Sequence, residues 1–567
     1  MNKYTHHNNE LTLKNLNQEV SLKGWVSKKR NLGGLIFIDL RDMHGITQLL
    51  CRPESPIYEE VSQLKNEYVI EVKGVVLERE SKNNQILTGD IEVLISDLNV
   101  LNTAVNPPIT ISDQDNISEE VRLKYRYLDL RKPSSKSYLI KRSLITQQVR
   151  QTLLKNDFLE LETPYLVKTT PEGAKEFIVP SRLYHGEGYA LAQSPQIFKQ
   201  LYMISGFEKY FQIARCFRDE DLRADRQLEF TQIDIEASFS KEEDIFNLSE
   251  EIMQAIFKNV LNKELKLPIE KMTYENAFNL YGSDKPDLRF ELKLMDYTSK
   301  IKRFNIPLFE NKEMVRALIV PNNPIFTRKY FDKLTEIVKK NHGDALAYVK
   351  NENNNLQGSI AKFVDTSLVE ENHILFLIPG TYFNATNATG ALRKQLGQDL
   401  NMIDENLESL VWIVDFPLFE YDENDQRLYA RHHPFTAPKN ASEFTTNPKD
   451  MIARAYDLVW NGYEVGGGSM RIYDQTIQNQ MFETLGFTKE EIENKFGFFI
   501  DALKYGTPPH GGIAFGLDRI VMLATKTDNI KDVIAFPKTQ SAKDLMMGSP
   551  SMIVEEQLEE LGLKVVK

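Results

Sequence analysis

Apolar and polar side chains alternate along short segments of the first hundred residues. The alternating segments are residues 20–30, 35–42, 46–51, 68–80 and 91–101. A short helical pattern lies near 57–66. A period of two is typical of strands with one buried face. Five such strands with one helix predict an OB-type β-barrel.

The second segment carries an aromatic side chain on its polar face. Its two faces hold Phe37, Asp39 and Arg41 on one side and Ile36, Ile38 and Leu40 on the other. Phe37 is close in sequence to Lys28, Lys29 and Arg30. An aromatic ring beside cations favours the stacking of unpaired bases while phosphate is held nearby. A solvated strand end with one partly covered Phe is an equally good interpretation.

A helical period follows the barrel. Residues 134–156 carry apolar side chains at about every third or fourth position, which predicts a long helix. A polar linker at about 103–117, marked by Pro107 and Pro108, precedes it. The strand-like segment FLELET follows the helix and is closed by Pro164.

The segment 210–239 predicts two strands joined by the charged loop RDEDLRADRQ. Gln232, Asp234 and Glu236 share one face of the second strand, and Arg218 falls in the corresponding row of the first. The opposite face is apolar and is expected to pack on a core. The polar row is either the floor of a pocket or an ordinary solvent-facing surface.

Residues 511–525, GGIAFGLDRIVMLAT, predict a strand, a glycine turn and the start of a helix. Arg519 lies near this turn, where the N–H groups of a helix N-terminus favour an anion. Glycine before a helix also serves packing alone, so this segment does not by itself predict a site.

The composition indicates a globular protein of several domains. The 567 residues exceed the size of one hydrophobic core, with 41% hydrophobic and 26% charged residues. The chain has no run of about 18 apolar residues, and its polar N-terminus lacks the apolar core of a secretory signal. We therefore expect a cytoplasmic protein with no membrane partner.

Charge and cysteine content argue against other classes of protein. A net charge of −12 disfavours a general nucleic-acid coat protein, although it allows local basic patches. The two cysteines, Cys51 and Cys216, are far apart and provide neither a disulfide framework nor a zinc site. Both are expected to be buried.

Three of these segments, in this order, resemble the signature motifs of class II aminoacyl-tRNA synthetases. The long helix with Pro164 is similar to motif 1, the FRDED…EFTQ hairpin to motif 2, and GIAFGLDR to motif 3. Six segments resemble the bacterial aspartyl enzymes of that family: TPEGA, QSPQIFKQL, FRDEDLRADRQ, HHPFTAPK, NGYEVGGGSMRI and GTPPHGGIAFGLDR. The resemblance implies a ligase that activates L-aspartate with ATP as aspartyl-adenylate, releases pyrophosphate, and transfers aspartate to the 3′ end of tRNA.

The resemblance also implies a multidomain α+β fold. It consists of an N-terminal OB-fold barrel that reads the anticodon, a catalytic domain on an antiparallel sheet, and an inserted α+β domain. The expected bounds are 1–104 for the barrel, 105–130 for a linker or hinge, 131–289 and 406–567 for the catalytic domain with a C-terminal extension, and 290–405 for the insertion. Motif 1 implies a homodimer. The expected partners are ATP, L-aspartate and tRNA-Asp, with tRNA-Asn as a second candidate.

The resemblance assigns roles to single residues. Arg218 would bridge the substrate carboxylate and the α-phosphate, and Arg519 would hold the γ-phosphate, which makes these two the expected catalytic residues. Phe230 would stack on adenine. The expected ATP-binding residues are Arg218, Asp219, Glu220, Gln227, Phe230, Glu464, Gly516, Leu517, Asp518 and Arg519. The expected aspartate-binding residues are Glu172, Ser194, Gln196, Lys199, Arg218, Gln232, Asp234, His432 and Arg471.

Asp457 and Glu464 match the Mg²⁺ ligands of the family, and carboxylates shared with phosphate oxygens suit this ion. Ordinary surface acids are the alternative, which the neighbouring glycines 466–468 and Arg471 disfavour. Glu464 and Arg471 are seven residues apart and so have opposite strand parity. A shared pocket therefore requires a β-bulge, which the three glycines could supply.

Charge predicts the selectivity. In the family, Lys199 and Arg471 would face the side-chain carboxylate of aspartate, and His432 would add a donor. An amide there would leave donors unpaired, at about 1–3 kcal/mol per group. An asparaginyl or lysyl ligase on the same scaffold is the first alternative, and neither substrate needs two cations.

A non-catalytic RNA-binding relative is the alternative from another class of protein. Such a protein would be expected to lose Arg218, Arg519 or Glu464, and all three are present. In the barrel, the positions that match anticodon contacts of the family are Arg30, Phe37, Gln48 and Glu92. His6 and His7 match nothing and are expected to lie in a disordered tail.

Overall fold

The computed structural model describes residues 4–169, 175–423 and 425–566. The chain forms two compact units. The first runs to Leu139 and includes Ala535–Thr539 and Lys543–Pro550, and the second contains Ile140–Ile534, Gln540–Ala542 and the segment from Ser551. Over the described ranges, no helix is both long and apolar enough to cross a membrane.

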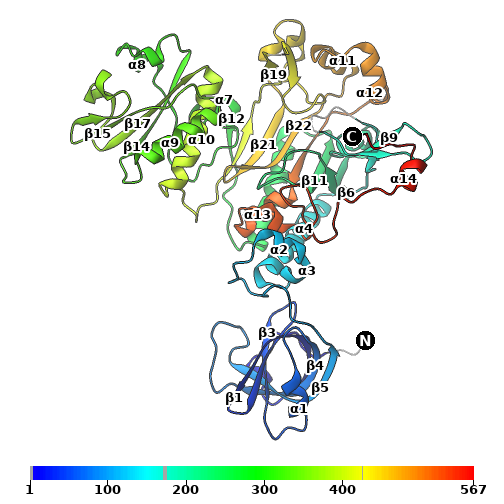
Figure 1. The fold of residues 1–567 in the computed structure, drawn as a ribbon. Coiled ribbons are helices and arrows are strands. Elements are labelled where there is room, and N and C mark those ends of the chain that lie inside the picture. The colour runs from blue at the N-terminus through cyan, green and yellow to red at the C-terminus, as the bar shows by residue number, and fades with distance from the viewer. Residues whose placement is uncertain (1–3, 170–174, 424, 567) are drawn as a thin grey trace. The chain divides into compact units, whose positions relative to one another are not determined.

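A closed five-stranded barrel forms most of the first unit (Figure 1). Its strands pair in the order β1-β2-β3-β5-β4. They are β1 (Glu19–Leu32), β2 (Leu35–Arg41), β3 (Ile46–Cys51), β4 (Val69–Glu78) and β5 (Ile91–Asn102), with helix α1 at Tyr58–Gln63. Ile36, Ile38 and Leu40 lie in the barrel core, as the alternation predicts.

Two features of this unit differ from the sequence pattern. Arg41, on the polar face of β2, is buried because its Nη2 donates to both carboxylate oxygens of Glu67 at 3.0 and 2.8 Å. His7 is not in a loose tail, since its ring lies 3.8 Å from the ring of His44. Asn8 next to it is buried and donates to the backbone of Lys23.

Short helices occupy the segment expected to be a linker. They are α2 (Glu119–Lys124) and α3 (Arg126–Asp129), followed by the long helix α4 (Pro133–Lys155). Arg126 donates to Asp129 at 2.6 Å and to the backbone oxygen of Ala535 at 3.0 Å. These contacts explain why residues 535–539 belong to the first unit.

An eight-stranded, mostly antiparallel sheet forms the centre of the second unit. Its order is β12-β18-β21-β22-β23-β11-β10-β6, and the pairs β12–β18 and β10–β6 are parallel. The strands are β6 (Leu159–Glu160), β10 (Lys209–Phe217), β11 (Glu229–Ser238), β12 (Glu270–Thr273), β18 (Leu410–Val414), β21 (Ala455–Trp460), β22 (Tyr463–Met470) and β23 (His510–Gly516). The predicted hairpin is β10 and β11, with Gln212 opposite Asp234 and Ala214 opposite Gln232.

A separate five-stranded sheet lies between β12 and β18 in the sequence. Its strands, in the order β13-β14-β17-β15-β16, are β13 (Met295–Asp296), β14 (Met314–Pro321), β17 (His373–Gly380), β15 (Ala347–Glu352) and β16 (Asn355–Gln357). Its helices are α8 (Thr298–Lys302), α9 (Arg328–Lys340) and α10 (Tyr382–Asp399). Leu334 of α9 and Leu392 of α10 share one core with Phe376, while Leu375 belongs to a second core that contains Ile301 of α8. The predicted fold class, with a barrel, a mostly antiparallel central sheet and an inserted α+β domain, is confirmed.

The remaining elements surround the central sheet. The helices are α5 (Gln196–Ile204), α6 (Glu242–Asn259), α7 (Tyr274–Tyr281), α11 (Gln475–Thr484), α12 (Lys489–Leu503), α13 (Leu517–Thr525) and α14 (Glu555–Glu560). The strands are β7 (Leu166–Val167), β8 (Ile178–Pro180), β9 (Gly188–Leu191), β19 (Phe419–Asp422) and β20 (Arg427–Ala430).

Candidate active site

A cavity of about 400 Å³ lies on the polar row of the central sheet. It is bounded by β11, β22 and β23, by the start of α5 and by the loop between β10 and β11. The expected site residues that line it are Ser194, Gln196, Lys199, Arg218, Glu220, Gln227, Phe230, Gln232, Asp234, His432, Asp457, Glu464, Arg471, Gly516, Asp518 and Arg519.

Three expected residues are not among those that line the cavity. Asp219 is exposed, and Leu517 is buried in the first turn of α13. Glu172 falls outside the described residues. The hairpin loop and the start of α13 thus contribute to the cavity through their other side chains.

The floor of the cavity is a compact group of opposite charges, the floor cluster. It consists of Lys199, Arg471, Asp234 and Glu236, each at most 2% exposed. Lys199 donates to Asp234 Oδ1 at 2.5 Å and lies 3.2 Å from Glu236 Oε2. Arg471 holds Glu236 with two parallel hydrogen bonds of 2.9 and 3.1 Å. Buried charges are tolerated only when they are paired, so these cations are compensated by the fold itself.

Burial and pairing shift the two carboxyl groups of the floor cluster in opposite directions. Burial raises the pKa of Asp234, although Lys199 opposes this shift. Burial alone would also raise the pKa of Glu236, but Arg471 and Lys199 hold it at about 2. Glu236 is therefore the permanently charged partner of the two cations.

His433 extends the floor cluster. Its Nε2 lies 2.7 Å from Nη1 of Arg471, which also donates to Ser469 Oγ at 2.5 Å. Burial, followed by the nearby Arg471, lowers the pKa of His433 well below its usual value. The ring is therefore neutral near pH 7 and adds no charge to the floor.

Buried polar atoms without a partner among the described residues point to a polar ligand. These atoms are Asp234 Oδ2, Gln196 Nε2, Arg218 Nε and His432 Nδ1. Asp234 offers an acceptor, whereas Gln196 and Arg218 offer donors. A ligand that satisfies this set must carry both an ammonium or N–H group and acceptor oxygens.

A β-bulge brings Glu464 to the same face as Arg471. Asp457 pairs with Gly467, whereas Val459 pairs with Glu464, so β22 contains one extra residue, Val465. The predicted bulge is present, but Val465 supplies it and the glycines follow it. The glycines instead let neighbouring side chains lie close to the backbone of β22, because a Cβ on residue 467 would lie 2.8 Å from Asp457 Oδ1.

Asp457 and Glu464 face a common point at one end of the cavity. A Cβ on Gly467 would lie 2.8 Å from Asp457 Oδ1 and 3.3 Å from Glu464 Oε1. Burial and the charge of Glu464 raise the pKa of Asp457. Burial acts in the same direction on Glu464, but Lys285, whose Nζ lies 2.8 Å from Oε2, makes the net shift of its pKa downward. This end gathers negative charge that a cation would stabilise.

Comparisons with known proteins identify the family. The family described as tRNA synthetases class II (D, K and N) matches residues 118–540, and an OB-fold nucleic acid binding domain matches residues 20–101. The chain belongs to the class II tRNA synthetases. A relative from Aster yellows witches'-broom phytoplasma named aspartate–tRNA ligase is 51% identical to this synthetase, over 99% of both chains. A Geobacillus relative named aspartate–tRNA(Asp/Asn) ligase is 48% identical, over 99% of this chain and 98% of its own.

Solved structures share the fold of the synthetase. The asparaginyl-tRNA synthetase of Pyrococcus horikoshii, complexed with asparaginyl-adenylate, aligns with a TM-score of 0.61 at 19% identity. The alignment covers 95% of this chain and 99% of that one. At this identity the likeness concerns the fold alone.

Asp518 of the synthetase connects three elements. It accepts hydrogen bonds from Arg142 of α4 and, at 2.7 Å, from the backbone of Thr231 on β11. The next residue, Arg519, donates to the backbone oxygen of Glu464 and lies 3.1 Å from Asp225. Asp518 thus positions the first turn of α13, while Arg519 faces the cavity.

Sequence reasoning missed several residues that line the cavity or its floor. Glu236 was placed in the polar row without a role, and His433 stands beside His432 in the HHPFTAPK segment. Lys285 belongs to the loop before the inserted domain, where no motif was recognised. The local sequence SDKPD, in which one lysine stands between two aspartates, could have indicated Lys285 as a candidate site residue.

The expected anticodon residues of the synthetase meet on one face of the barrel. Arg30 lies opposite Phe37 and donates to Asp39 at 2.6 Å and to Gln48 at 3.1 Å. Gln48 donates to Glu92 at 2.7 Å. Arg79, which the sequence did not predict, also donates to Gln48, at 2.9 Å.

Proposed function

We propose that this synthetase is an aspartate–tRNA ligase. It joins L-aspartate to AMP with release of pyrophosphate and then transfers aspartate to the 3′ end of tRNA-Asp in the cytoplasm, where charged tRNA is used. The observation that carries this proposal is the floor cluster, in which two buried cations meet two carboxylates beneath the cavity. Relatives with this name at 46–51% identity support it.

The charge of the site suits aspartate. The floor cluster is neutral, with two cations and two carboxylates, and Arg218 adds one positive charge. Aspartate carries two carboxylates and one ammonium group, hence one net negative charge. Asp234 Oδ2 accepts from the ammonium group, and Lys199 and Arg471 receive the side-chain carboxylate.

Selection against asparagine follows from the way in which Lys199 and Arg471 are paired with carboxylates of the fold. Lys199 and Arg471 keep their carboxylate partners within the fold when the cavity holds no ligand. Each of the two cations also has a further N–H donor, which only an anionic oxygen satisfies well. An amide replaces one such oxygen by N–H groups, which face the same two cations at a cost of about 1–3 kcal/mol per unmet group. Lysine would place a third positive charge there.

The nucleotide lies on the other side of Arg218. The guanidinium carbon of Arg218 lies 5.0 Å from the centre of the Phe230 ring, and both line the cavity. Phe230 offers its other face to adenine, with Gln227 and Glu220 near the base and Arg519 at the γ-phosphate. No side chain acts as nucleophile, because the substrate carboxylate attacks the α-phosphorus, so catalysis consists of alignment and charge stabilisation.

Asp457 and Glu464 fit a Mg²⁺ ion. Both offer carboxylate oxygens to one point, and hard oxygen ligands suit this ion. The described residues contain no group of three or more metal-binding side chains, so phosphate and water oxygens complete such a site. When bound, Mg²⁺ neutralises the phosphate chain of ATP. Arg218 and Arg519 orient that chain from the protein side.

We also assign the barrel face to the anticodon. Phe37 stacks on an unpaired base, and the network of Arg30, Gln48, Arg79 and Glu92 presents hydrogen-bonding groups that distinguish base edges. Homodimer formation by α4 is supported by the exposed apolar side chains Ile140, Leu144 and Leu154.

Aspartate-dependent exchange of pyrophosphate into ATP tests the activation step. We expect exchange with aspartate and none above background with asparagine or lysine. Equal exchange with asparagine would refute the assignment. Charging of purified tRNA-Asp and tRNA-Asn in parallel then determines the tRNA partners, since the relatives carry both names.

A further inference from the structure

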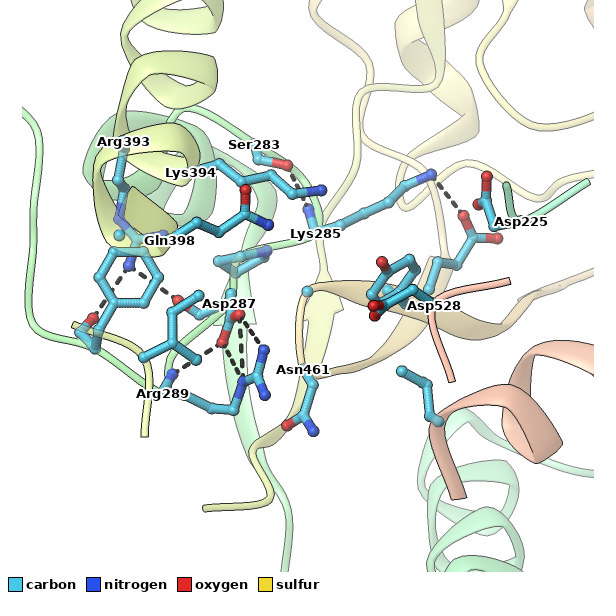
Figure 2. Close-up of a pocket in the computed structure, with 18 of the residues that line it drawn as sticks. Asp225, Ser283, Lys285, Asp287, Arg289, Arg393, Lys394, Gln398, Asn461 and Asp528 are labelled. Atoms are coloured by element: carbon cyan, nitrogen blue, oxygen red, sulfur yellow. Dashed lines mark hydrogen bonds and ion pairs between the residues drawn. The ribbon is translucent and has the colours of Figure 1, made fainter. Parts of the chain in front are cut away.

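A second and larger cavity, of about 1010 Å³, lies beside the catalytic one, between the central sheet and the inserted domain. We call it the insertion groove. Figure 2 shows Lys394 and Gln398 of α10 reaching toward the loop that carries Ser283 and Lys285. On the opposite side the insertion groove is lined by the hairpin loop, including Arg223, by α13 and by the residues that follow α13.

The insertion groove joins the catalytic cavity at one end only. The two cavities share Asp225, Arg226, Lys285, Glu464 and Arg519. All residues of the floor cluster, as well as Arg218 and Phe230, are absent from the lining of the groove. The groove therefore opens from the metal and γ-phosphate end of the proposed site, not from its amino-acid end.

Cations in the insertion groove exceed their carboxylate partners. The acids at its inner end are paired, Glu464 with Lys285 at 2.8 Å and Asp225 with Arg519 at 3.1 Å. Within the described ranges, Arg223 and Lys394 line the groove with no carboxylate within 4.0 Å. Four further acids line the groove: Asp287 and Glu405 pair with Arg289, Glu408 pairs with Lys263, and Asp528 has no ion pair among the described residues.

A buried arginine strengthens this positive wall. Arg393 donates to the backbone oxygens of Leu292, Asp287 and Phe290, and its guanidinium carbon lies 3.9 Å from the centre of the Phe290 ring. Carbonyl groups and rings do not neutralise its charge. The wall formed by α10 thus carries a buried and an exposed cation in adjacent positions, which attracts multivalent anions.

We propose that the insertion groove binds inorganic pyrophosphate and is its path out of, and back into, the catalytic cavity. This inference rests on the proposed function. In the activation step an oxygen of the substrate carboxylate bonds to the α-phosphorus, and the bond from that phosphorus to the oxygen bridging to the β-phosphorus breaks. Pyrophosphate leaves with the electron pair of that bond. Lys285 and Arg519 are the first cations it meets, and Arg223 and Lys394 follow along the groove.

Substitutions at the outer cations test the path. We measure the KM for pyrophosphate in the reverse reaction, in which it converts enzyme-bound aspartyl-adenylate to ATP, for K394Q, R223Q and the double variant. Each exposed charge contributes up to about 1 kcal/mol, so we expect the KM to rise about threefold in each single variant and about tenfold in the double variant. The control is K340Q, at the exposed end of α9 and outside the groove, which should match wild type.

Binding without turnover supplies the second readout. Calorimetric titration of inorganic pyrophosphate into the full-length protein should show weaker binding in the double variant than in K340Q. Equal pyrophosphate KM and equal binding in both would overturn the proposal, and a raised KM for tRNA alone would show that the groove holds RNA instead. If wild type showed no aspartate-dependent exchange, the proposed function would fail, and the titration would still decide whether the groove binds pyrophosphate.

Discussion

The two ends of the catalytic cavity handle charge in different ways. At the floor cluster, Lys199 and Arg471 are fully buried and paired with carboxylates of the fold. At the proposed phosphate end, Asp457 and Glu464 gather negative charge beside Lys285, whose side chain is 41% exposed. A buried, compensated cluster keeps one geometry and so selects one substrate. An open end with exchangeable partners suits groups that enter and leave in every turnover.

The strongest test of this difference removes a cation from the floor cluster. Lys199→Met should lower aspartate-dependent pyrophosphate exchange about a thousandfold, because loss of a buried, charge-assisted hydrogen bond to a bound partner costs about 2–5 kcal/mol. Thermal unfolding, with K340Q as the matched lysine control, separates loss of activity from loss of fold. Activity within about tenfold of wild type would mean that Lys199 does not face the substrate.

Removing the carboxylate of Glu236 tests whether it balances the charges of the two buried cations. Glu236 has a pKa of about 2 in the fold, below its ordinary value of 4.5. Its charge therefore stabilises the protein fully above pH 4.5, and this contribution is lost as the pH falls toward 2. Glu236→Gln should cost about 3 kcal/mol of unfolding free energy at pH 7.

The measurement is denaturant unfolding of wild type and E236Q between pH 3 and 7. The difference between the two proteins should shrink as the pH falls, because protonation removes the same charge from the wild type. A difference that stays constant over this range would contradict the compensating role of Glu236.

At the phosphate end, Asp457→Asn should raise the Mg²⁺ concentration needed for half-maximal exchange. We expect a shift of about a hundredfold or less, in the range that metal-site substitutions typically show. Binding of Mn²⁺ to the protein, followed by electron paramagnetic resonance, gives a readout independent of activity. An unchanged Mg²⁺ requirement with weaker aspartate binding would place Asp457 in the amino-acid pocket instead.

The smallest effect should arise outside both ends. Phe37→Ala removes the stacking ring of the barrel and should raise the KM for tRNA about tenfold, since a stacked base contributes about 1–3 kcal/mol. Pyrophosphate exchange without tRNA should keep its wild-type rate. Loss of that exchange would mean that the substitution disturbs more than RNA binding.

The sequence predicted what depends on local pattern. Alternation alone placed Phe37 outside and Ile38 inside the barrel, and it put Asp234 and Glu236 in one row. It could not show that Glu236 pairs with Arg471, because the two residues are 235 positions apart and no period connects them. Lys285 escaped notice for the same reason, since only the folded chain brings it to Glu464.

The burial of charged side chains is the second feature that the sequence pattern could not predict. The alternation along β2 predicts an exposed Arg41. Its burial depends on Glu67, which lies in the connection between α1 and β4. Likewise, the family resemblance implies that Lys199 and Arg471 are cations for a substrate, but it does not reveal that the fold already pairs them with carboxylates. Resemblance to relatives gave the roles, whereas the partners came from three-dimensional contacts.

Val465 has a consequence for how this protein tolerates change. The extra residue in β22 reverses which face of the sheet the side chains occupy between residues 464 and 466. The position of Glu464 therefore depends on the number of residues in β22 more than on which residue stands at 465. Exchanging Val465 for another apolar residue preserves the phase. Deleting it would turn Glu464 to the far side of the sheet, away from Asp457, while Arg471 kept its place.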